Sequence, residues 1–179
     1  MARTAQAFDT RTARRGDARR MGQIHVDSWR ETYASLLPAE LLVNLSADRE
    51  ASRYVRTIET FRPGFAALVA CDSSGLVAGF LTMGPSRHQA GYGEIYTLYV
   101  DPNHVGQGIG SALFRHAVRE AAFDRAGGFD GIEIRVLKGN PATQFYRRMG
   151  AHKTGELAAR FGNVPITEEI FLLVGSVAP

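Results

Sequence analysis

The chain has 179 residues, of which 45% are hydrophobic and 22% are charged, an ordinary composition for a globular protein with one substantial core. Its formal net charge of +3 favours acidic ligands only weakly and does not by itself require a nucleic acid as partner. Because the only cysteine is Cys71, and because no membrane-spanning run or signal-peptide pattern occurs, the sequence excludes an intrachain disulfide and predicts a single cytoplasmic domain over residues 1–179 without membrane contact.

Five arginines stand close together near the N-terminus, after a loose tail predicted over residues 1–8. They are interspersed with Asp9 and Asp17 and with no aromatic residue, which favours a solvated edge strand and helix start over a nucleic-acid-binding or transit-peptide segment. Asp17 is expected to cap the helix that comes next. The five residues are Arg11, Arg14, Arg15, Arg19 and Arg20.

Three helices are predicted next. From Met21 onward, apolar and aromatic residues recur at three- and four-residue steps, which is typical of a helix with one apolar face. Pro38 suits the opening of a second helix, and a third segment is charged on its outer side. The expected helices are residues 18–33, 39–45 and 47–60.

Three strands come after the helices. Ser73, Ser74 and Gly75 form a turn signal between two apolar runs, which predicts a hairpin. A polar loop over residues 84–93 then leads to a run, Glu94–Val100, that is almost entirely β-branched, aromatic or aliphatic, as in a central strand covered on both faces. The expected strands are residues 66–72, 76–83 and 94–100.

The rest of the chain alternates helices and strands. Asp101, Pro102 and Asn103 break the central strand, and Gly127 and Gly128 stop the helix after it. The expected elements are a helix over 109–125, a strand over 131–138, a helix over 141–149 and two closing antiparallel strands over 151–156 and 166–174. The strand, helix, strand passage implies that 94–100 and 131–138 pair in parallel, which gives an α/β arrangement with a mixed sheet.

Metal and thiol chemistry are not indicated by the sequence. The five histidines show no metal-ligand spacing, so we predict no metal site. His88, in the polar loop, is interpreted either as a solvated side chain or as a substrate contact. Cys71 lies in an apolar run and is expected to be an inert core thiol.

Three alternating glycines, Gly106, Gly108 and Gly110, lead directly into the helix at 109. The first amides of a helix lack intrahelical partners and lie at the positive end of its dipole, and glycine lets an anion approach them closely. The turn therefore predicts phosphate binding, with a tight packing turn as the alternative. A P-loop is excluded because no lysine follows Gly110. The dinucleotide-binding fingerprint is excluded because Ser111 or Leu113 occupies the position of its third glycine.

Two segments together carry a family resemblance. Residues 105–110 read VGQGIG and resemble motif A of the GNAT superfamily of acyl-CoA-dependent N-acetyltransferases, Q/R-x-x-G-x-G/A, which lies between the fourth strand and the following helix. Residues 140–151 read NPATQFYRRMGA and are similar to motif B of that family. Two motifs in this order are far more specific than one, and the resemblance extends over roughly residues 24–174.

The resemblance implies acetyl-CoA as co-substrate and a GNAT-like fold: a mixed, mostly antiparallel central sheet, flanked by helices, with one splayed parallel strand pair whose gap holds the pantetheine arm. Val105 stands where the family usually has arginine or glutamine, which leaves the backbone cradle without that side-chain contact. Asn140 would bind the pantetheine amides or else cap a helix, and amides near Leu98 and Val100 would polarise the thioester carbonyl. The residues expected to contact the cofactor are Leu98, Val100, Val105, Gly106, Gln107, Gly108, Ile109, Gly110, Ser111, Asn140 and Tyr146.

Acetyl transfer to an amine needs a base, because an alkylammonium with a pKa of about 10 cannot attack until it loses a proton. Glu94 occupies a strand position where related enzymes often carry that base, acting directly or through water, and alternation puts Tyr96 and Leu98 on its face. A polar strand end is the alternative interpretation of Glu94. Tyr146 occupies the position where the family places the acid that protonates the departing thiolate, and a buried structural tyrosine is its alternative.

The acceptor is the least determined part of the prediction. Trp29 and Tyr33 lie on the helix that in this family covers the acceptor end of the cleft, and with Tyr96 they are candidate substrate contacts, with core packing as the alternative. The expected function is acetyl transfer to a primary amine of a small molecule or peptide, and the family suggests a homodimer. An acetyl-CoA-binding sensor without catalysis is the second hypothesis, and salt-sensitive nucleic-acid binding through the N-terminal arginines is ranked last.

Overall fold

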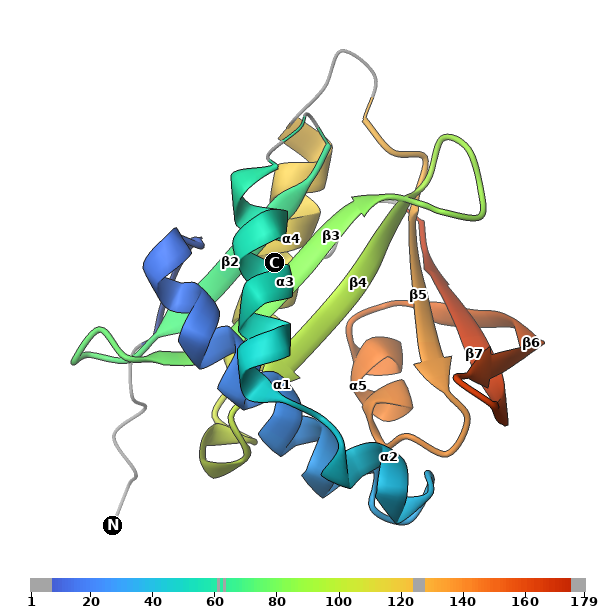
Figure 1. Cartoon of the computed structure of the whole chain (residues 1–179). Helices are drawn as coiled ribbons and strands as arrows, with labels where there is room; N and C mark the ends of the chain where they lie inside the picture. Colours follow the sequence, from blue (N-terminus) through green and yellow to red (C-terminus); the bar gives the residue numbers. More distant parts are fainter. Residues whose placement is uncertain (1–7, 61, 63, 124–127, 175–179) are drawn as a thin grey trace, which may run out of the picture.

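The computed structural model describes residues 8–60, 62, 64–123 and 128–174, so most of the predicted tail lies outside the described residues. Seven strands form one sheet in the order β1-β2-β3-β4-β5-β7-β6 (Figure 1). All neighbouring pairs are antiparallel except β4 and β5, which are parallel as predicted. The strands are β1 (Asp9–Thr12), β2 (Ala66–Cys71), β3 (Val77–Pro85), β4 (Gly93–Val100), β5 (Ile132–Leu137), β6 (His152–Phe161) and β7 (Val164–Leu173).

The helices flank this sheet. No helix in the described part of the chain combines the length and the apolar character needed to cross a bilayer. The helices are α1 (Ala18–Tyr33), α2 (Ala39–Val43), α3 (Ala47–Glu59), α4 (Ile109–Phe123) and α5 (Ala142–Arg148), with two 3₁₀ turns, η1 (Arg15–Asp17) and η2 (Pro102–His104).

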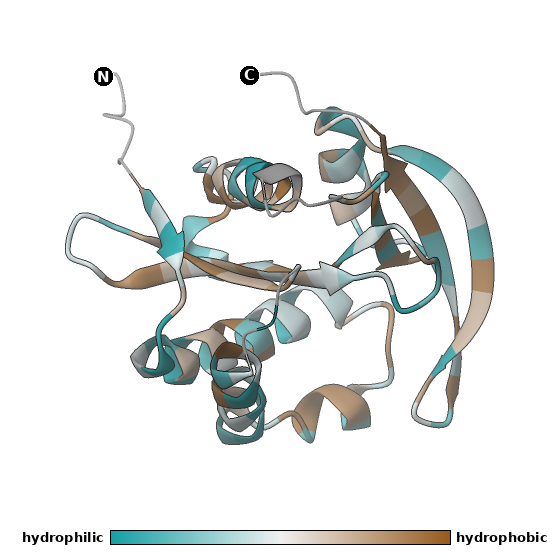
Figure 2. Cartoon of the chain, turned by 90° about the horizontal axis from the view of Figure 1, so that it is seen from above, coloured by the Kyte–Doolittle hydropathy of each residue, from teal (hydrophilic) through white to brown (hydrophobic). Residues whose placement is uncertain are grey.

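Helices cover both faces of the sheet, which buries its central strands as the apolar run at β4 predicted (Figure 2). On one face α4 inserts Leu113, Phe114 and Ala117, all fully buried, into the larger hydrophobic core. On the other face α1 and α3 form a second core around Met21 and Tyr54. The fold is therefore a three-layer α/β arrangement with β4 in its middle layer.

The parallel pairing of β4 with β5 is short. Only three pairs form, from Gly93 with Ile132 to Ile95 with Ile134. Beyond Ile95, β4 continues to pair with β3 on its other edge, while β5 pairs with β7. The two strands consequently separate, which confirms the predicted splayed pair.

A β-bulge at Tyr96 changes which residues of β4 share a face. Thr97 pairs with Thr82 but Ile95 pairs with Met83, so Tyr96 is an extra residue on β4, and an extra residue reverses the alternation beyond it. Leu98 therefore packs with Ile95 in the core beneath α4, whereas Tyr99 lies in the core beneath α1. The prediction that Leu98 shares the face of Glu94 was wrong for this reason.

The acidic residue before α1 also acts differently from the prediction. Asp17 does not cap α1. Its carboxylate accepts two hydrogen bonds from the Arg11 guanidinium, at 2.7 and 2.9 Å, and one from the Arg14 amide. Burial alone would raise the pKa of Asp17, but these partners hold it below its usual value. Asp17 thus joins the edge strand β1 to the start of α1.

Ion pairs also support the solvated interpretation of the N-terminal arginines. Arg20 pairs with the buried Asp101 and donates to the Val77 carbonyl at 3.1 Å. Arg15 pairs with Glu59 on α3. The Arg20 contacts attach α1 to the residue after β4 and to the start of β3, and the Arg15 contact attaches η1 to α3, so these guanidiniums have structural partners within the chain.

The two closing strands are longer than predicted. Strand β6 extends to Phe161 and β7 begins at Val164, so Gly162 and Asn163 alone connect them. Polar residues on both strands hid their extent, because the exposed face of a hairpin needs no apolar residue. Helices α2 and α3 are shorter than predicted, by two residues and one residue respectively.

A close contact between α1 and α3 fixes the first layer of helices. A Cβ built at Gly22 would collide with the Ala47 carbonyl oxygen and lie 2.7 Å from the Ala51 amide nitrogen. Glycine costs about 1 kcal/mol relative to alanine inside a helix, so its presence here is explained by backbone approach and not by helix propensity.

We therefore expect Gly22→Ala to destabilise the fold by about 1–3 kcal/mol, the usual cost of overpacking. Its melting temperature should fall by about 2–4 °C for each kcal/mol, measured by circular dichroism. Gly16→Ala is the matched control, because a Cβ at Gly16 meets nothing within 4 Å. An unchanged or higher melting temperature for Gly22→Ala would contradict the contact.

Candidate active site

The glycine turn has the backbone of an anion cradle. Gly106 and Gly108 have φ of +81° and +85°, a region that other residues rarely adopt. A Cβ at either position would meet nothing within 4 Å, so their side faces open space. Helix α4 starts at Ile109, and Ala112 donates the first bond of the helix to the Gly108 carbonyl at 3.0 Å. The amides before Ala112 are those that a helix leaves without intrahelical partners.

The other predicted cofactor residues near this turn differ in what they can offer. Val105 is 68% exposed and carries no charge. Ile109 is 1% exposed and packs in the core, so only its backbone can face a ligand. Gln107 and Ser111 are partly exposed. The turn therefore offers mainly main-chain groups to a ligand.

A narrow cavity of about 210 Å³ lies between β4 and β5 where they separate. The first turn of α5 and the end of α1 also contribute to its wall. Five of the predicted cofactor residues line it together, namely Leu98, Val100, Val105, Asn140 and Tyr146. The remaining predicted residues, 106–111, follow Val105 directly and form the turn next to this cavity and the first residues of α4.

Asn140 connects two walls of the narrow cavity. Its side-chain amide donates to the Tyr33 hydroxyl at 2.9 Å, and its carbonyl oxygen accepts from the Ala142 amide at 2.8 Å. The second bond satisfies one amide at the start of α5, so the predicted capping contact is present beside the cavity. The first bond ties α5 to α1 through Tyr33.

Tyr146 lies on α5 with only 6% of its surface exposed. Aromatic rings surround it, with the Phe145 ring 5.1 Å away and those of Phe114 and Phe171 at 6.2 and 6.5 Å. Burial, together with the nearby Tyr33, raises the pKa of the Tyr146 phenol far above its usual value. The phenol therefore stays protonated at neutral pH and can donate a proton to a group in the narrow cavity.

A wide cavity of about 550 Å³ lies on the other side of the strand separation. It is formed by α1, the loop before β4, strands β4 and β5, and the β6–β7 hairpin. The three predicted acceptor residues, Trp29, Tyr33 and Tyr96, all line it. The two cavities meet along a shared wall consisting of Tyr33, Ile95, Tyr96, Tyr99 and Arg135.

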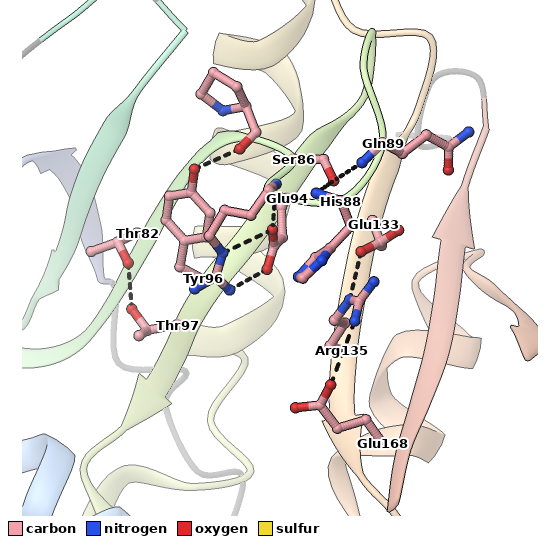
Figure 3. A network of polar contacts seen from close by, with 12 residues as sticks. Thr82, Ser86, His88, Gln89, Glu94, Tyr96, Thr97, Glu133, Arg135 and Glu168 are labelled. Atoms are coloured by element: carbon pink, nitrogen blue, oxygen red, sulfur yellow. Dashed lines mark hydrogen bonds and ion pairs between the residues drawn. The ribbon is translucent and has the colours of Figure 1, made fainter. Parts of the chain in front are cut away.

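Glu94 faces the wide cavity but is already engaged (Figure 3). Its carboxylate, 1% exposed, accepts bonds from the Arg87 amide at 3.0 Å and from Nε of Arg87 at 3.1 Å, and pairs with a terminal nitrogen of the same guanidinium. Burial alone would raise the pKa of Glu94, but Arg87 holds it below the usual value. Glu94 is therefore ionised at neutral pH and is a weak proton acceptor.

Charged residues that the sequence analysis missed continue this network along β5 and β7. Arg135 donates to Glu133 at 2.7 Å and lies 3.7 Å from Glu168 (Figure 3). Each charge is ordinary in the sequence, since alternating charges on a strand usually indicate a solvated face. Only the folded sheet places them beside Glu94.

His88 lies in the same group. Its ring, Glu94 and Glu133 each offer a possible metal-ligand atom within 4.8 Å of the others. Both carboxylates are already hydrogen-bonded to arginines, so the cluster is neutralised without a cation. The absence of a metal site stays a prediction.

Aromatic residues form the opposite wall of the wide cavity. Trp29 donates to the Tyr99 hydroxyl at 2.7 Å and lies 5.0 Å from the Phe161 ring. His25 stacks on Tyr99 at 4.8 Å, and burial lowers the pKa of this imidazole to about 4. Tyr99 escaped the sequence analysis because of the bulge, and Phe161 was expected in a loop.

Comparisons with known proteins place these features in a family. Residues 19–151 match the acetyltransferase (GNAT) family. The uncharacterized N-acetyltransferase YuaI of Bacillus subtilis (strain 168) is 32% identical over 152 residues, which cover 82% of this chain and 81% of that protein.

Solved structures share the fold. An N-acetyltransferase from Staphylococcus aureus Mu50 is 20% identical with a TM-score of 0.72, covering 94% of this chain and 98% of the other. The PaiA N-acetyltransferase of Thermoplasma acidophilum, solved in complex with coenzyme A, is 16% identical with a TM-score of 0.67, covering 91% of this chain and 98% of that one.

The glycine cradle can be tested by binding of coenzyme A. Alanine at Gly108 would favour other loop conformations by about 1–2 kcal/mol and add a methyl group on the open side, so we expect affinity to fall about tenfold or more, measured by calorimetric titration. Gly75→Ala is the control, because Gly75 has a similar φ of +84° and an open side but lies in the turn between β2 and β3 and lines neither cavity. Equal losses in both variants would contradict the special role of Gly108.

Proposed function

Because the chain belongs to the GNAT acetyltransferase family, it is an acetyl-CoA-dependent N-acetyltransferase, and we propose that it transfers the acetyl group to a primary amine of a small molecule or peptide by direct attack. The observation that carries this proposal is the meeting of two cavities at the separation of β4 and β5. One is continuous with the glycine turn, and the other opens between aromatic and charged walls. A thioester in the first cavity and an amine in the second can thus meet at the residues that line both cavities.

The residues around the narrow cavity fit acetyl-CoA, which supplies the activated acetyl group. The turn at Gly106 and Gly108 would hold phosphate through main-chain amides, and Val105 adds no charge to it. Asn140 would offer its side-chain amide to the pantetheine arm once it exchanges its bond with Tyr33. The edge of β4 beyond Ile95 is not paired with β5, which supports amides near Leu98 and Val100 as donors to the thioester carbonyl.

On the acceptor side, the amine must lose a proton before it attacks. We assign the base to Glu94, acting directly or through water, because it lines the wide cavity and is buried beside the shared wall. Its ion pair with Arg87 weakens it as a proton acceptor and keeps it ionised. The same negative charge would attract the ammonium form of the acceptor.

On the leaving-group side, we assign the acid to Tyr146. A thiol like that of coenzyme A has a pKa of about 8.5, and a protonated phenol within reach can neutralise the departing thiolate. Burial of Tyr146 among aromatic rings keeps the proton on the phenol at neutral pH. Because burial also makes the phenol a weaker acid, the proton leaves only when the negative charge of the thiolate develops beside it. The donated proton is restored from solvent after the products leave.

The first experiment combines calorimetric titration with acetyl-CoA and thiol release against a panel of primary amines. Tight binding with amine-dependent release is the expected result. Binding without release from any amine would contradict the proposed reaction and favour the sensor hypothesis, in which the domain binds acetyl-CoA without turnover. Failure to bind would contradict both.

Tyr146→Phe should lower kcat by about 10²–10⁴-fold, the usual range for one general acid, with little change in the affinity for acetyl-CoA. The ring and its packing are retained, so the loss isolates the hydroxyl. Tyr54→Phe is the control, because Tyr54 lines neither cavity and its hydroxyl is hydrogen-bonded to Nδ1 of His25 over 2.8 Å. A kcat for Tyr146→Phe that equals the wild-type value would exclude this residue as the acid.

Arg87→Met should move the acidic limb of the kcat/KM profile to higher pH. Loss of the guanidinium leaves burial to raise the pKa of Glu94, so the carboxylate is protonated, and inactive as a base, at higher pH than in the wild type. Rates measured across a pH series check this shift. Arg56→Met, on the exposed side of α3, should leave the profile unchanged, and an unmoved limb in Arg87→Met would remove Glu94 from the base role.

A further inference from the structure

The wide cavity has a charge balance that bears on the identity of its acceptor, and any assignment of that acceptor rests on the proposed function. Three carboxylates, those of Glu94, Glu133 and Glu168, pair with two guanidiniums, Arg87 and Arg135, and all of these except the buried Glu133 line the cavity. The arginine and glutamate charges that line the cavity balance, and Glu133 leaves the cluster with one negative charge in excess. The cavity is thus electrostatically suited to a ligand with a single positive charge.

Neither arginine has a charge that is not already shared with a carboxylate of the chain. Arg87 pairs with Glu94 through its side chain and its amide, although its side chain is 63% exposed. Arg135 contacts Glu133 at 2.7 Å and Glu168 at 3.7 Å, and its side chain is only 13% exposed. A carboxylate brought beside these ion pairs would meet the surplus negative charge and would lose its hydration without gaining a cation of its own.

The opposite wall is apolar and rigid. Trp29 and Phe161 lie in ring contact, and Trp29 is fixed by its bond to Tyr99. Aliphatic side chains of the β6–β7 hairpin, including Leu157 and Ile166, extend this surface. A second ammonium group placed there would have aromatic faces but no carboxylate as partner, whereas an apolar body would bury its surface favourably.

From this two-sided lining we infer that the acceptor is a primary monoamine with an apolar, preferably aromatic, body and no carboxylate, of the chemical class of phenethylamine. The ammonium lies toward Glu94 and Glu168, and the ring lies against the surface formed by Trp29 and Phe161. Transfer then forms an amide nitrogen–carbon bond and breaks the thioester carbon–sulfur bond, with one amine proton leaving to the base and the thiolate taking a proton from the acid.

Trp29 supplies a direct probe of this cavity, because it is the only tryptophan in the chain. Its fluorescence reports a ligand in the wide cavity whether or not any acetyl group is transferred. Phenethylamine, L-phenylalanine and spermidine form a matched set, since the second adds only a carboxylate to the first and the third replaces the ring with further charges.

The experiment titrates the protein, saturated with coenzyme A, with each of the three compounds and monitors Trp29 fluorescence. We expect phenethylamine to bind at least about tenfold more tightly than L-phenylalanine or spermidine, from the cost of an unpaired charge. Equal or tighter binding of L-phenylalanine or spermidine, or no response to phenethylamine, overturns the inference.

Two variants on the β6–β7 hairpin distinguish the effect of the charge in the cavity from a general effect of substitution on the hairpin. Glu168→Gln removes the surplus charge and should weaken phenethylamine by about two- to fivefold, as expected for a partly exposed charge, while narrowing its preference over L-phenylalanine. Glu156→Gln is the control, because Glu156 pairs with Lys138 and Lys153 and does not line the cavity. An unchanged preference in Glu168→Gln would contradict the charge argument.

Thiol release, measured on parallel samples that contain acetyl-CoA in place of coenzyme A, separates this inference from the proposed function. Selective binding of phenethylamine without thiol release would support the inferred class of ligand and contradict the proposed acetyl transfer. Thiol release with amines outside this class, together with weak phenethylamine binding, would keep the reaction and overturn the ligand class.

Discussion

The arrangement of both cavities depends on the short parallel pairing of β4 with β5, which stops at Ile95. Parallel strands normally exchange hydrogen bonds along their length, but here only three residue pairs form before each strand turns to a different neighbour. The separation leaves one edge of β4 without a strand partner in the middle of a buried sheet. Because unpaired main-chain groups are costly when buried, this edge is suited to a ligand that carries amides and a carbonyl, and both cavities open from it.

The cavities on the two sides of the strand separation offer different chemical groups to a ligand. On the side of α4, the groups offered to a ligand are main-chain amides at left-handed glycines, so the missing basic side chain at Val105 leaves the cradle in place. On the side of α1, they are side chains, with rings on one wall and ion pairs on the other. Tyr146 and Glu94 belong to different sides, so a phenol and a carboxylate line two neighbouring cavities.

The sequence was sufficient for the order of elements, the parallel pair and the family, because apolar runs, turn residues and two spaced motifs are local signals. It was also sufficient to select Leu98, Val100, Val105, Asn140 and Tyr146, which the fold brings to one cavity. It was insufficient for Tyr99, because a bulge reverses alternation without changing the composition of the strand, and for Arg87, because the pairing of a loop residue depends on tertiary structure. The sequence was also insufficient for Asp17, because its carboxylate pairs with Arg11 and does not cap the helix.

The hydrogen bond between Asn140 and Tyr33 has a thermodynamic consequence. Tyr33 lines both cavities and is held by Asn140 across the narrow one. A ligand that claims the Asn140 amide frees the Tyr33 hydroxyl, and a ligand that repositions Tyr33 from the other cavity releases Asn140. If acetyl-CoA takes the Asn140 amide as proposed, the two binding equilibria would be linked, and linkage is reciprocal: the factor by which one ligand changes the affinity for the second is the factor by which the second changes the affinity for the first. Cooperativity between co-substrate and acceptor would then pass through the Tyr33 side chain, which lines both cavities.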